Sequence, residues 1–390
     1  MTSSAQSISE STFAWLALTM TPQLGPTRIR RVVERLGDAK AVLRASLTEL
    51  EACGLPASAA QALALGASRQ AAEQELARAA AVGVELLCLD DPGYPEALKN
   101  IYDPPVLLYV RGDRQVLDSA GIAVVGTRHP TPYGLGMAER LACDLSARGL
   151  IIFSGLARGV DSAAHRGAVQ ARGKTVGVLG TGVDVIYPRE NKKLVEQMLE
   201  QGGAILSEFP MGTAPTPQNF PIRNRIISGL STGVLVVEAG EYSGTRITAR
   251  CALEQCREVY AVPGNVINRL SWGPNTLIKQ GAKLVATWED VWEELPSQVR
   301  LRLQPPEGRE GESESGTGKT GSLFPGLPEL QPNEKKVYAL IKADTSTNID
   351  ELVERLESQV STSVIFSVLF ELELNGRIKQ LPGKNFVRTF

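Results

Sequence analysis

The chain has 390 residues, of which 43% are hydrophobic and 22% charged, and its formal net charge is −2 at pH 7. This length is too great for one compact core and predicts two or three domains. The near-neutral charge excludes attraction of nucleic acid by bulk charge, so any anion site requires local clustering of basic residues.

Cysteine and histidine usage argues against a metal site. The two histidines, His129 and His165, exclude a histidine-rich metal centre, and the five cysteines form no C-x-x-C pair. We therefore expect reduced, mostly buried thiols, no metal and no cofactor. The apolar run from Phe13 to Met20 is too short to span a bilayer and lacks a signal-peptide pattern, so we expect a cytoplasmic protein without membrane contact.

Residues 1–82 predict an N-terminal helical domain of the SAM-like or helix-hairpin-helix kind. A turn at Leu24-Gly25-Pro26 precedes a helix from Thr27 to Gly37, and a further helix is expected from Ala71 to Val82. Turn amides followed by basic side chains can contact a phosphate, but a plain helical bundle explains the pattern better, because Gly-Pro turns before helices are common in any protein.

Residues 83–300 predict a Rossmann-like domain. Short runs rich in β-branched residues or leucine recur here, and most are followed by a helix-length segment. A doubly wound, mostly parallel sheet covered on both faces gives this α/β pattern. The expected strands are Val84–Leu89, Val106–Val110, Ile122–Val125, Ile151–Phe153, Val176–Leu179, Ala204–Leu206, Val234–Val237, Val259–Val262 and Leu284–Ala286.

Glycine and hydroxyl residues follow nearly every expected strand, often close to a basic residue. Ligands of such sheets lie beyond the carboxyl ends of the strands, where glycines let backbone amides approach phosphate oxygens. One such loop has an ordinary steric explanation, but several at one edge predict an anion-binding crevice. The segments are Gly126-Thr127-Arg128, Ser154-Gly155, Gly180-Thr181-Gly182, Ser207-Glu208, Ser243-Gly244 and Pro263-Gly264-Asn265.

The segment from Phe220 to Ser231 predicts a helix with a charged start. Its isoleucines and Leu230 recur at helical spacing, and Arg223, Asn224 and Arg225 gather near the expected first turn. Positive charge at a helix amino end is unfavourable. Two partners could compensate it: an anionic ligand, or acidic side chains elsewhere in the fold.

Residues 301–328 predict a flexible polar linker, and residues 329–390 a winged helix. In the linker, Gly318-Lys319-Thr320 resembles the end of a Walker A loop, but no strand precedes it. Helices are expected at Glu334–Lys342, Ile349–Leu356 and Thr362–Leu374, followed by a hairpin over residues 376–388. The third helix has no lysine or arginine, so it is at least as well suited to protein contact as to DNA reading.

Several motifs, taken together and in this order, resemble those of the DNA-processing protein A family (DprA, also called Smf) of bacteria. The motifs are Val125-Gly126-Thr127-Arg128, the segment from Ser154 to His165, the segment from Gly180 to Pro188, the segment from Phe220 to Ser231, Val262-Pro263-Gly264-Asn265 and the segment from Gly273 to Ile278.

The resemblance implies a binder of single-stranded DNA in natural transformation, and not an enzyme. Members of the family form homodimers through the Rossmann-like domain and protect incoming single strands. They also help to load the RecA recombinase onto DNA that is covered by single-strand-binding protein. These partners and this dimer are what we expect by resemblance.

The resemblance also implies the residues of the DNA site. Basic and aromatic groups in one groove bind single strands without sequence preference. Relatives often have a lysine shortly before the Phe-Pro pair, whereas this chain has Pro217-Gln218-Asn219, and Lys192 or Arg246 is the candidate to replace it. The expected DNA-binding residues are Gly126, Thr127, Arg128, Ser154, Gly155, Gly180, Gly182, Arg189, Lys192, Phe220, Arg223, Asn224, Arg225, Ser243 and Gly244.

The alternative is a nucleotide-processing enzyme similar to the LOG-type phosphoribohydrolases of the same superfamily. The segment from Val237 to Thr245 is loosely similar to their glycine-rich turn after a strand, but their Pro-Gly-Gly turn is absent, and Ile247-Thr248-Ala249 replaces the glutamate expected on the following helix. Glu238 or Asp184 could hydrogen-bond a ribose, yet no activated nucleophile or matched acid and base pair is evident. His165, on a helix for which Asp161 is the expected N-cap, is predicted to be structural or phosphate-facing.

Overall fold

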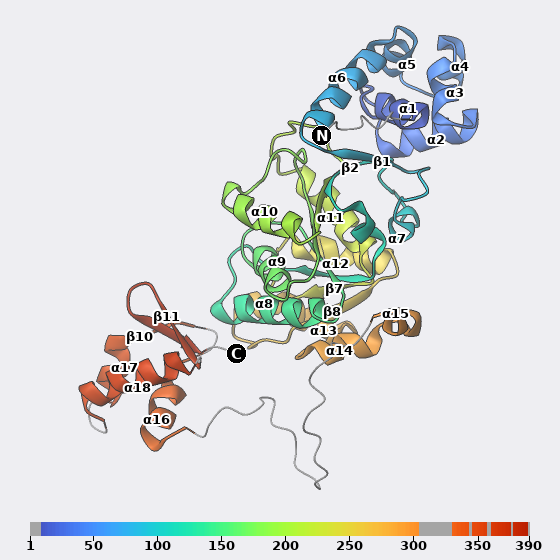
Figure 1. Cartoon of the computed structure of the whole chain (residues 1–390). Helices are drawn as coiled ribbons and strands as arrows, with labels where there is room; N and C mark the ends of the chain where they lie inside the picture. Colours follow the sequence, from blue (N-terminus) through green and yellow to red (C-terminus); the bar gives the residue numbers. More distant parts are fainter. Residues whose placement is uncertain (1–8, 304–329, 343–344, 357–359, 376, 389–390) are drawn as a thin grey trace.

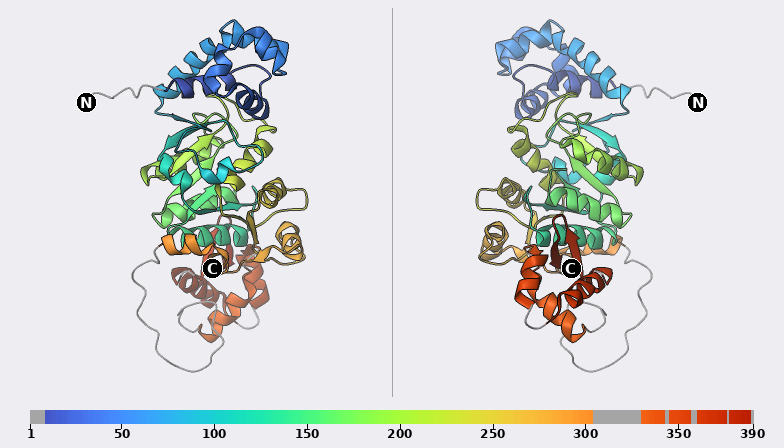
Figure 2. Two further views of the ribbon diagram at one scale, coloured as in Figure 1. Left: turned by 90° about the vertical axis from the view of Figure 1, so that its right-hand side faces the viewer. Right: turned by 90° about the vertical axis from the view of Figure 1, so that its left-hand side faces the viewer.

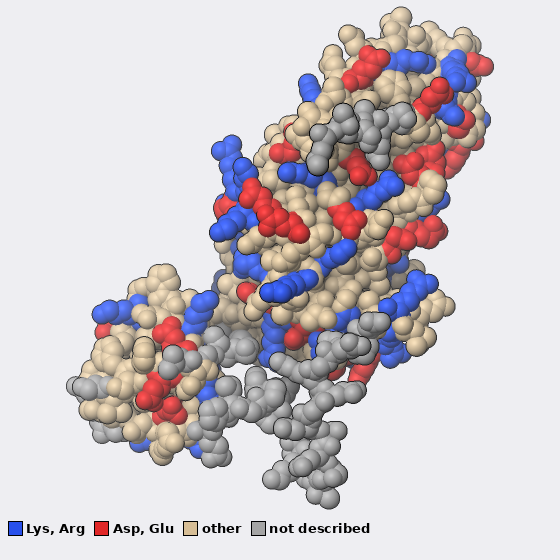
Figure 3. All heavy atoms as spheres, in the orientation of Figure 1, with Lys and Arg blue, Asp and Glu red and all other residues tan. Residues whose placement is uncertain are grey.

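The computed structural model describes residues 9–303, 330–342, 345–356, 360–375 and 377–388 (Figure 1). The chain begins with a group of helices, continues as an α/β domain and ends in a small domain of helices and short strands. On the face shown in Figure 3, basic and acidic side chains are interspersed, as the formal net charge of −2 suggests.

The N-terminal group confirms the predicted turn and helix. Gly25 precedes α2, which starts at Pro26, and three of the four arginines of this helix donate to backbone carbonyl groups, among them Arg35 to Cys53 O at 3.0 Å. Arg28 donates to Gln23 O and Arg30 to Tyr102 O, each at 3.0 Å. The helices are α1 (Glu10–Thr19), α2 (Pro26–Leu36), α3 (Ala39–Arg44), α4 (Leu47–Ala52), α5 (Ala57–Ala64) and α6 (Ala67–Ala81).

The α/β domain contains a nine-stranded sheet in the order β1-β2-β6-β5-β4-β3-β7-β8-β9. Every predicted strand is present. From β6 to β9 the strands are parallel, whereas β2 pairs antiparallel with both β1 and β6. The strands are β1 (Glu85–Cys88), β2 (Leu107–Gly112), β3 (Gly121–Val125), β4 (Ile151–Ser154), β5 (Thr175–Val178), β6 (Ala204–Ser207), β7 (Gly233–Val236), β8 (Glu258–Ala261) and β9 (Lys283–Leu284).

Helices cover both faces of the parallel strands, as their continuous apolar sequences require. In β3, Ile122 and Val124 pack with α8, α9 and α14, while Ala123 and Val125 pack with α7, α11 and α12. These helices are α7 (Glu96–Lys99), α8 (Pro132–Ser146), α9 (Val160–Gln170), α10 (Lys192–Glu200), α11 (Asn219–Leu230), α12 (Thr245–Glu254), α13 (Trp272–Lys279), α14 (Trp288–Glu294) and α15 (Ser297–Arg302).

The strand order reverses at the centre of the sheet. The chain runs from β3 outward through β4 and β5 to β6, then crosses over by α11 to β7 on the other side of β3. The loops that follow β3 and β7 therefore diverge to opposite faces, which leaves a crevice at the carboxyl edge between them.

The N-terminal helices pack on the antiparallel end of this sheet (Figure 2). Leu16, Leu18 and Ile29 belong to the same buried cluster as Leu107 and Tyr109 of β2. Polar contacts cross the same junction. Glu75 of α6 is buried, and its Oε1 accepts a hydrogen bond of 2.6 Å from the backbone N–H of Met211.

The C-terminal domain has the predicted three helices and hairpin, together with a short strand, β10, that the sequence did not suggest. β10 spans two residues and pairs with β12, too short a segment for any alternation of apolar residues to show. The elements are α16 (Pro332–Leu340), β10 (Thr347–Asn348), α17 (Ile349–Leu356), α18 (Thr362–Leu374), β11 (Ile378–Leu381) and β12 (Asn385–Arg388).

The predicted linker is only partly within the described residues. Its first two positions are the end of α15, which extends to Arg302, and its Gly318-Lys319-Thr320 segment lies outside the described residues. Within the described part of the chain, no helix is both long and apolar enough to cross a membrane. The cysteines are free thiols, but only Cys88 is fully buried and Cys256 is exposed, so the expectation of mostly buried thiols was wrong.

Candidate functional site

A cleft of about 1040 Å³ opens at the carboxyl edge where the strand order reverses. The loops after β3 and β7, the segment after β5, the first half of α11 and the start of α13 form its walls. It is lined by Val125, Gly126, Thr127, Arg128, His129, Ala157, Asp161, Tyr187, Pro215, Pro217, Phe220, Pro221, Arg223, Asn224, Ile227, Gly240, Glu241, Tyr242, Ser243, Gly244, Thr245, Ile247, Thr248, Arg269, Leu270 and Trp272.

Phe220 is the centre of an aromatic and cationic cluster in this cleft. Its half-buried ring has the guanidinium carbon of Arg128 5.2 Å from its centroid and that of Arg223 at 6.0 Å. The ring of Tyr187, which is 38% exposed, lies 5.9 Å away at an interplanar angle of 35°. Arg128 is itself exposed, so an aromatic surface and a solvated positive charge face the cleft together.

Gly180 allows Phe220 to take this position. A Cβ at residue 180 would lie 2.8 Å from the ring, so any side chain there would displace Phe220. Gly180 is thus close to the cluster but does not line the cleft. Glycine is needed at this position because the Phe220 ring packs against its Cα.

Arg223 forms the floor of the cleft rather than its surface. The side chain donates to Gly155 O at 2.8 Å and to the carbonyl oxygen of Val178, and the residue is only 4% exposed. Burial lowers the pKa of Arg223 to about 10, although Asp161 opposes the shift. Arg223 therefore ties α11 to the ends of β4 and β5 and contributes a positive field from below.

Asp161 completes this floor. Its Oδ2 accepts hydrogen bonds from the backbone N–H groups of Gly155 (3.1 Å) and Ala157 (3.4 Å). Burial raises the pKa of Asp161, and Arg223 opposes that shift. The predicted N-cap role was wrong, because α9 begins at Val160, two residues earlier than expected, and its N-cap is Gly159 with a positive φ of 76°.

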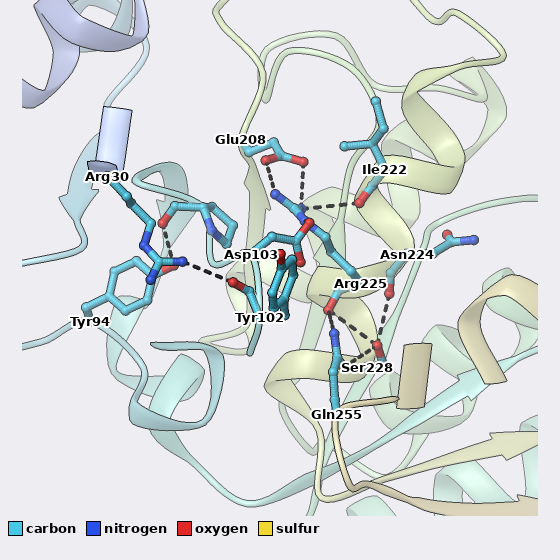
Figure 4. A network of polar contacts seen from close by, with 11 residues as sticks. Arg30, Tyr94, Tyr102, Asp103, Glu208, Ile222, Asn224, Arg225, Ser228 and Gln255 are labelled. Carbon is cyan, nitrogen blue, oxygen red and sulfur yellow. Dashed lines mark hydrogen bonds and ion pairs between the residues drawn. The ribbon is translucent and has the colours of Figure 1, made fainter. Parts of the chain in front are cut away.

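The side chain of Arg225 points toward Glu208 and Asp103 (Figure 4), and Arg225 does not line the cleft. Its guanidinium makes a bidentate pair with Glu208 (2.9 and 2.7 Å), and its Nε donates to Asp103 at 2.9 Å. Although burial lowers it, the two carboxylates hold the pKa of Arg225 above its ordinary value. For Arg225, acidic side chains of the fold therefore compensate the positive charge, which is the second of the two possibilities left open by the sequence. Arg225 lines a separate cavity of about 920 Å³.

The expected first turn of α11 was also placed wrongly. The helix begins at Asn219, so Arg223 and Arg225 lie in its second turn. They therefore add no positive charge to its first turn. Residues two apart on a helix point in different directions, and of Arg223, Asn224 and Arg225 only the first two join Phe220 in the cleft. Asn224 Oδ1 accepts a hydrogen bond of 3.3 Å from Arg223 Nε.

Several of the other expected residues have packing roles. Ser154 is buried, and its Oγ donates to Val124 O at 2.7 Å. A Cβ at Gly126 would meet Val160, one at Gly155 would meet the Arg223 guanidinium, and one at Gly182 would meet Pro210 O. Gly126 still lines the cleft, whereas Ser154, Gly155 and Gly182 do not.

The remaining expected residues divide between the cleft and the outer surface. Thr127, Ser243 and Gly244 line the cleft, with open space in front of the Gly244 Cα. Arg189 and Lys192 are exposed, but neither is among the residues that line it.

The carboxylates considered for an enzyme are engaged in structural contacts. Glu238 is buried and accepts hydrogen bonds from the backbone N–H (2.9 Å) and Oγ1 (2.6 Å) of Thr131, the N-cap of α8. Both carboxylate oxygens of Asp184 accept from Gly212 N, at 2.8 and 3.1 Å. Among the described residues, no group of three or more His, Cys, Asp or Glu is placed to hold a metal ion.

His165 is structural. It is fully buried, and its Nδ1 lies 2.7 Å from the hydroxyl of Thr175, which donates to Ile152 O. It does not line the cleft.

Sequence reasoning missed several lining residues, notably Tyr187, Tyr242, Arg269 and Trp272. Tyr187 directly follows a glycine-rich loop and precedes Pro188, a position that could have indicated its exposure. Trp272 lies far along the chain from Phe220, and no local pattern connects the two.

The winged helix presents an apolar rather than a basic third helix. On α18, Phe366 is 50% exposed and Phe370 68% exposed, with Glu371 and Glu373 exposed nearby. Acidic and aromatic groups on this helix do not suit contact with the phosphates of a major groove.

Fold and cleft together define a class: a Rossmann-like α/β protein, joined to helices before it and a winged helix after it, with aromatic rings and guanidiniums in its carboxyl-edge cleft. Residues 85–296 match the family DNA recombination-mediator protein A, and residues 325–384 match the DprA winged helix domain. The chain belongs to the DNA recombination-mediator protein A family.

Known relatives agree with this assignment. The chain is 44% identical over 299 residues to Protein Smf of Escherichia coli strain K12, covering 76% of each chain. It is 46% identical over 215 residues to the DNA processing protein DprA of Bacillus subtilis strain 168, covering 55% of this chain and 72% of that one. The X-ray structure of DprA from Streptococcus pneumoniae matches with a TM-score of 0.65 and 34% identity, covering 74% of this chain and 99% of that chain.

Proposed function

We propose that this protein binds single-stranded DNA during natural transformation, and that the strand lies in the cleft around Phe220. The observation that carries the proposal is the Phe220 ring with the exposed Arg128 guanidinium 5.2 Å from its centroid and Tyr187 beside it. Aromatic faces stack unpaired bases and arginines contact phosphates, whatever the base sequence. Bases in a duplex are already stacked, so this cluster favours single strands.

The residues proposed to contact the strand are those that line the cleft. Of the expected set, they are Gly126, Thr127, Arg128, Phe220, Asn224, Ser243 and Gly244, with Arg223 acting from below. Arg225 is left out because its guanidinium is occupied by Glu208 and Asp103. Arg189 and Lys192 remain candidates only for a strand that continues beyond the cleft.

The proposal includes a binding rather than a catalytic role. It is supported by the engagement of Glu238 and Asp184 in backbone contacts, which leaves neither placed as a general acid or base. Incubation with nucleoside monophosphates should release no free base, whereas release would favour the phosphoribohydrolase alternative.

The proposed partners follow from the family. A recombination mediator acting on incoming strands would work in the cytoplasm with the RecA recombinase and single-strand-binding protein. We also propose a homodimer through the Rossmann-like domain, supported by exposed apolar side chains there such as Leu253, Val266 and Ile267. Light scattering of the purified chain would measure its oligomeric state.

The deciding experiment is charge reversal at Arg128, measured by the anisotropy of labelled oligothymidylate at several salt concentrations. Arg128→Glu should weaken binding to every single-strand sequence alike. It should also reduce the slope of log affinity against log salt by about 0.7 for each phosphate that the protein no longer neutralises. Arg223→Glu is unsuitable, because it would place a carboxylate against the buried carbonyl groups of Gly155 and Val178.

Arg166→Glu is the matched control, since Arg166 is exposed on α9 and does not line the cleft. It changes the net charge equally but should leave the salt slope unchanged. Equal effects of the Arg128 and Arg166 variants would show that only overall charge matters and would reject the cleft as the binding site.

A further inference from the structure

A second aromatic ring with a stacked guanidinium lies at the edge of the cleft: the ring of Trp272 lines the cleft, and Arg246 lines an adjoining cavity of about 540 Å³ that Trp272 also borders. The ring of Trp272, at the start of α13, has the guanidinium carbon of Arg246 5.4 Å from its centroid. The residue is 39% exposed. This pair repeats the combination found at Phe220, where Arg128 lies 5.2 Å from the ring.

The backbone around Trp272 is held firmly against the loop that follows β7. Gly273 N donates to Ala239 O, and Ala239 N donates to Leu270 O, each at 2.8 Å. A Cβ at residue 273 would lie 2.6 Å from Ala239 O, so this close approach requires glycine. The indole is therefore positioned before any ligand arrives, which lowers the ordering cost of binding.

Arg246 is also anchored within the chain. It is exposed at the start of α12, and its Nη1 donates to Glu241 O at 2.8 Å. The guanidinium covers the indole on the side of the adjoining cavity, which Arg246 and Trp272 both line. It can turn toward a phosphate when a base takes its place on the indole.

The rest of this wall suits a nucleic-acid strand. Tyr242 lines the cleft with 91% of its surface exposed, and Arg269 adds another exposed cation. The cleft volume of about 1040 Å³ lies at the upper end of the range for small-molecule sites, about 300–1,000 Å³. It has room for more than one base.

We propose that Trp272 is a second base-stacking platform, so that the cleft holds two nucleotides of one strand, one on Phe220 and one on Trp272. Arg128 and Arg246 then contact the phosphates next to the two stacked bases. This inference rests on the proposed function of the cleft, but it assigns a separate subsite and a stacking residue, Trp272, that the family resemblance did not indicate.

Tryptophan fluorescence tests the subsite directly, because the chain has only four tryptophans. Trp15 is buried among the N-terminal helices, and Trp288 and Trp292 pack against each other in α14. Titration of the full chain with a strand of about 15 thymidylates should quench the emission. Trp272→Phe should abolish most of that quenching while keeping a ring for stacking, so that affinity changes little.

Trp272→Leu separates the two platforms by strand length. It should weaken binding of the long strand about five- to a hundredfold, the effect expected when one base stack is removed, and leave binding of thymidine monophosphate on Phe220 unchanged. Arg246→Ala, which keeps the indole, should weaken the long strand less but reduce its salt slope.

Trp288→Phe is the matched control. Trp288 also carries a stacked arginine, Arg148 at 3.1 Å, but it does not line the cleft. This variant should keep the quenching.

Quenching that persists in Trp272→Phe, or a Trp272→Leu variant that binds the long strand as tightly as the parent, would overturn the second platform. If the parent chain binds the labelled strand without quenching, this inference alone fails. If it binds no single strand at all, the proposed function fails as well.

Discussion

The imidazole of His165 should remain neutral well below the ordinary pKa of histidine. Its Nδ1 must carry the proton, because the Thr175 hydroxyl already donates to Ile152 O and can only accept from the ring. The other nitrogen, Nε2, is buried and has no hydrogen-bond partner among the residues that the structure describes. Protonation would place an unsatisfied charged N–H in the core, and burial, reinforced by Arg223 and Arg166, lowers the pKa of His165 to about 3.

The sign and size of the effect on stability follow from linkage. The unfolded chain takes up a proton near its usual pKa of 6.5, whereas the folded chain resists until about pH 3. The stabilising contribution of the neutral ring is therefore fully present above pH 6.5 and is lost as the pH falls toward 3. Between pH 7.5 and pH 5, this one group should cost roughly 2 kcal/mol of unfolding free energy.

Proton NMR of the imidazole signals measures the pKa directly, because the chain has two histidines. The His129→Gln variant assigns the signals. The His165 signal should not move between pH 8 and pH 5. In denaturant unfolding, the parent chain should lose roughly 2 kcal/mol more than His165→Gln over the same change from pH 7.5 to pH 5.

Two results would refute this reasoning. One is a His165 signal that titrates near pH 6.5, which would mean that the ring reaches water or an acidic partner. The other is an equal loss of stability in the parent and the His165→Gln variant, which would mean that other groups cause the acid sensitivity.

The remaining predictions concern the two sides of α11. Glu208→Gln should lower the free energy of unfolding by roughly 3 kcal/mol, measured with denaturant, because it leaves the buried Arg225 without its bidentate partner. An unchanged stability would show that this pair is not held in the folded chain. Gly180→Ala should weaken binding of oligothymidylate, because its methyl group would lie 2.8 Å from the Phe220 ring. Gly93→Ala, with no atom within 4 Å of its Cβ, should not weaken it, and parallel losses in both variants would contradict the packing argument.

The strands of the sheet could be predicted because their sequences carry the signal locally. Ile122 to Val125 and Val234 to Val237 are apolar without interruption, and a strand buried on both faces requires this. The pairing of β2 with β6 could not be predicted. It depends on contacts between residues far apart in the chain, such as Tyr109 and Ser207.

The arginines of α11 show the same limit at the candidate site. Arg223 and Arg225 have the same chemistry and neighbouring positions, so composition could not tell which one reaches the cleft. Which arginine reaches the cleft depends on partners from other parts of the chain. Arg225 pairs with Glu208, and Arg223 donates to the carbonyl group of Gly155. Arg128, which follows a strand at the central reversal, was predictable because topology alone directs that loop to the crevice.

The match to the family begins at residue 85, yet the cooperative folding unit does not begin there. Leu16, Leu18 and Ile29 share one buried cluster with Leu107 and Tyr109, on the far side of that boundary. A fragment cut at residue 85 would leave the antiparallel margin of the sheet bare and prone to self-association. The minimal stable fragment of this protein must therefore retain the N-terminal helices, even for experiments that concern only the cleft around Phe220.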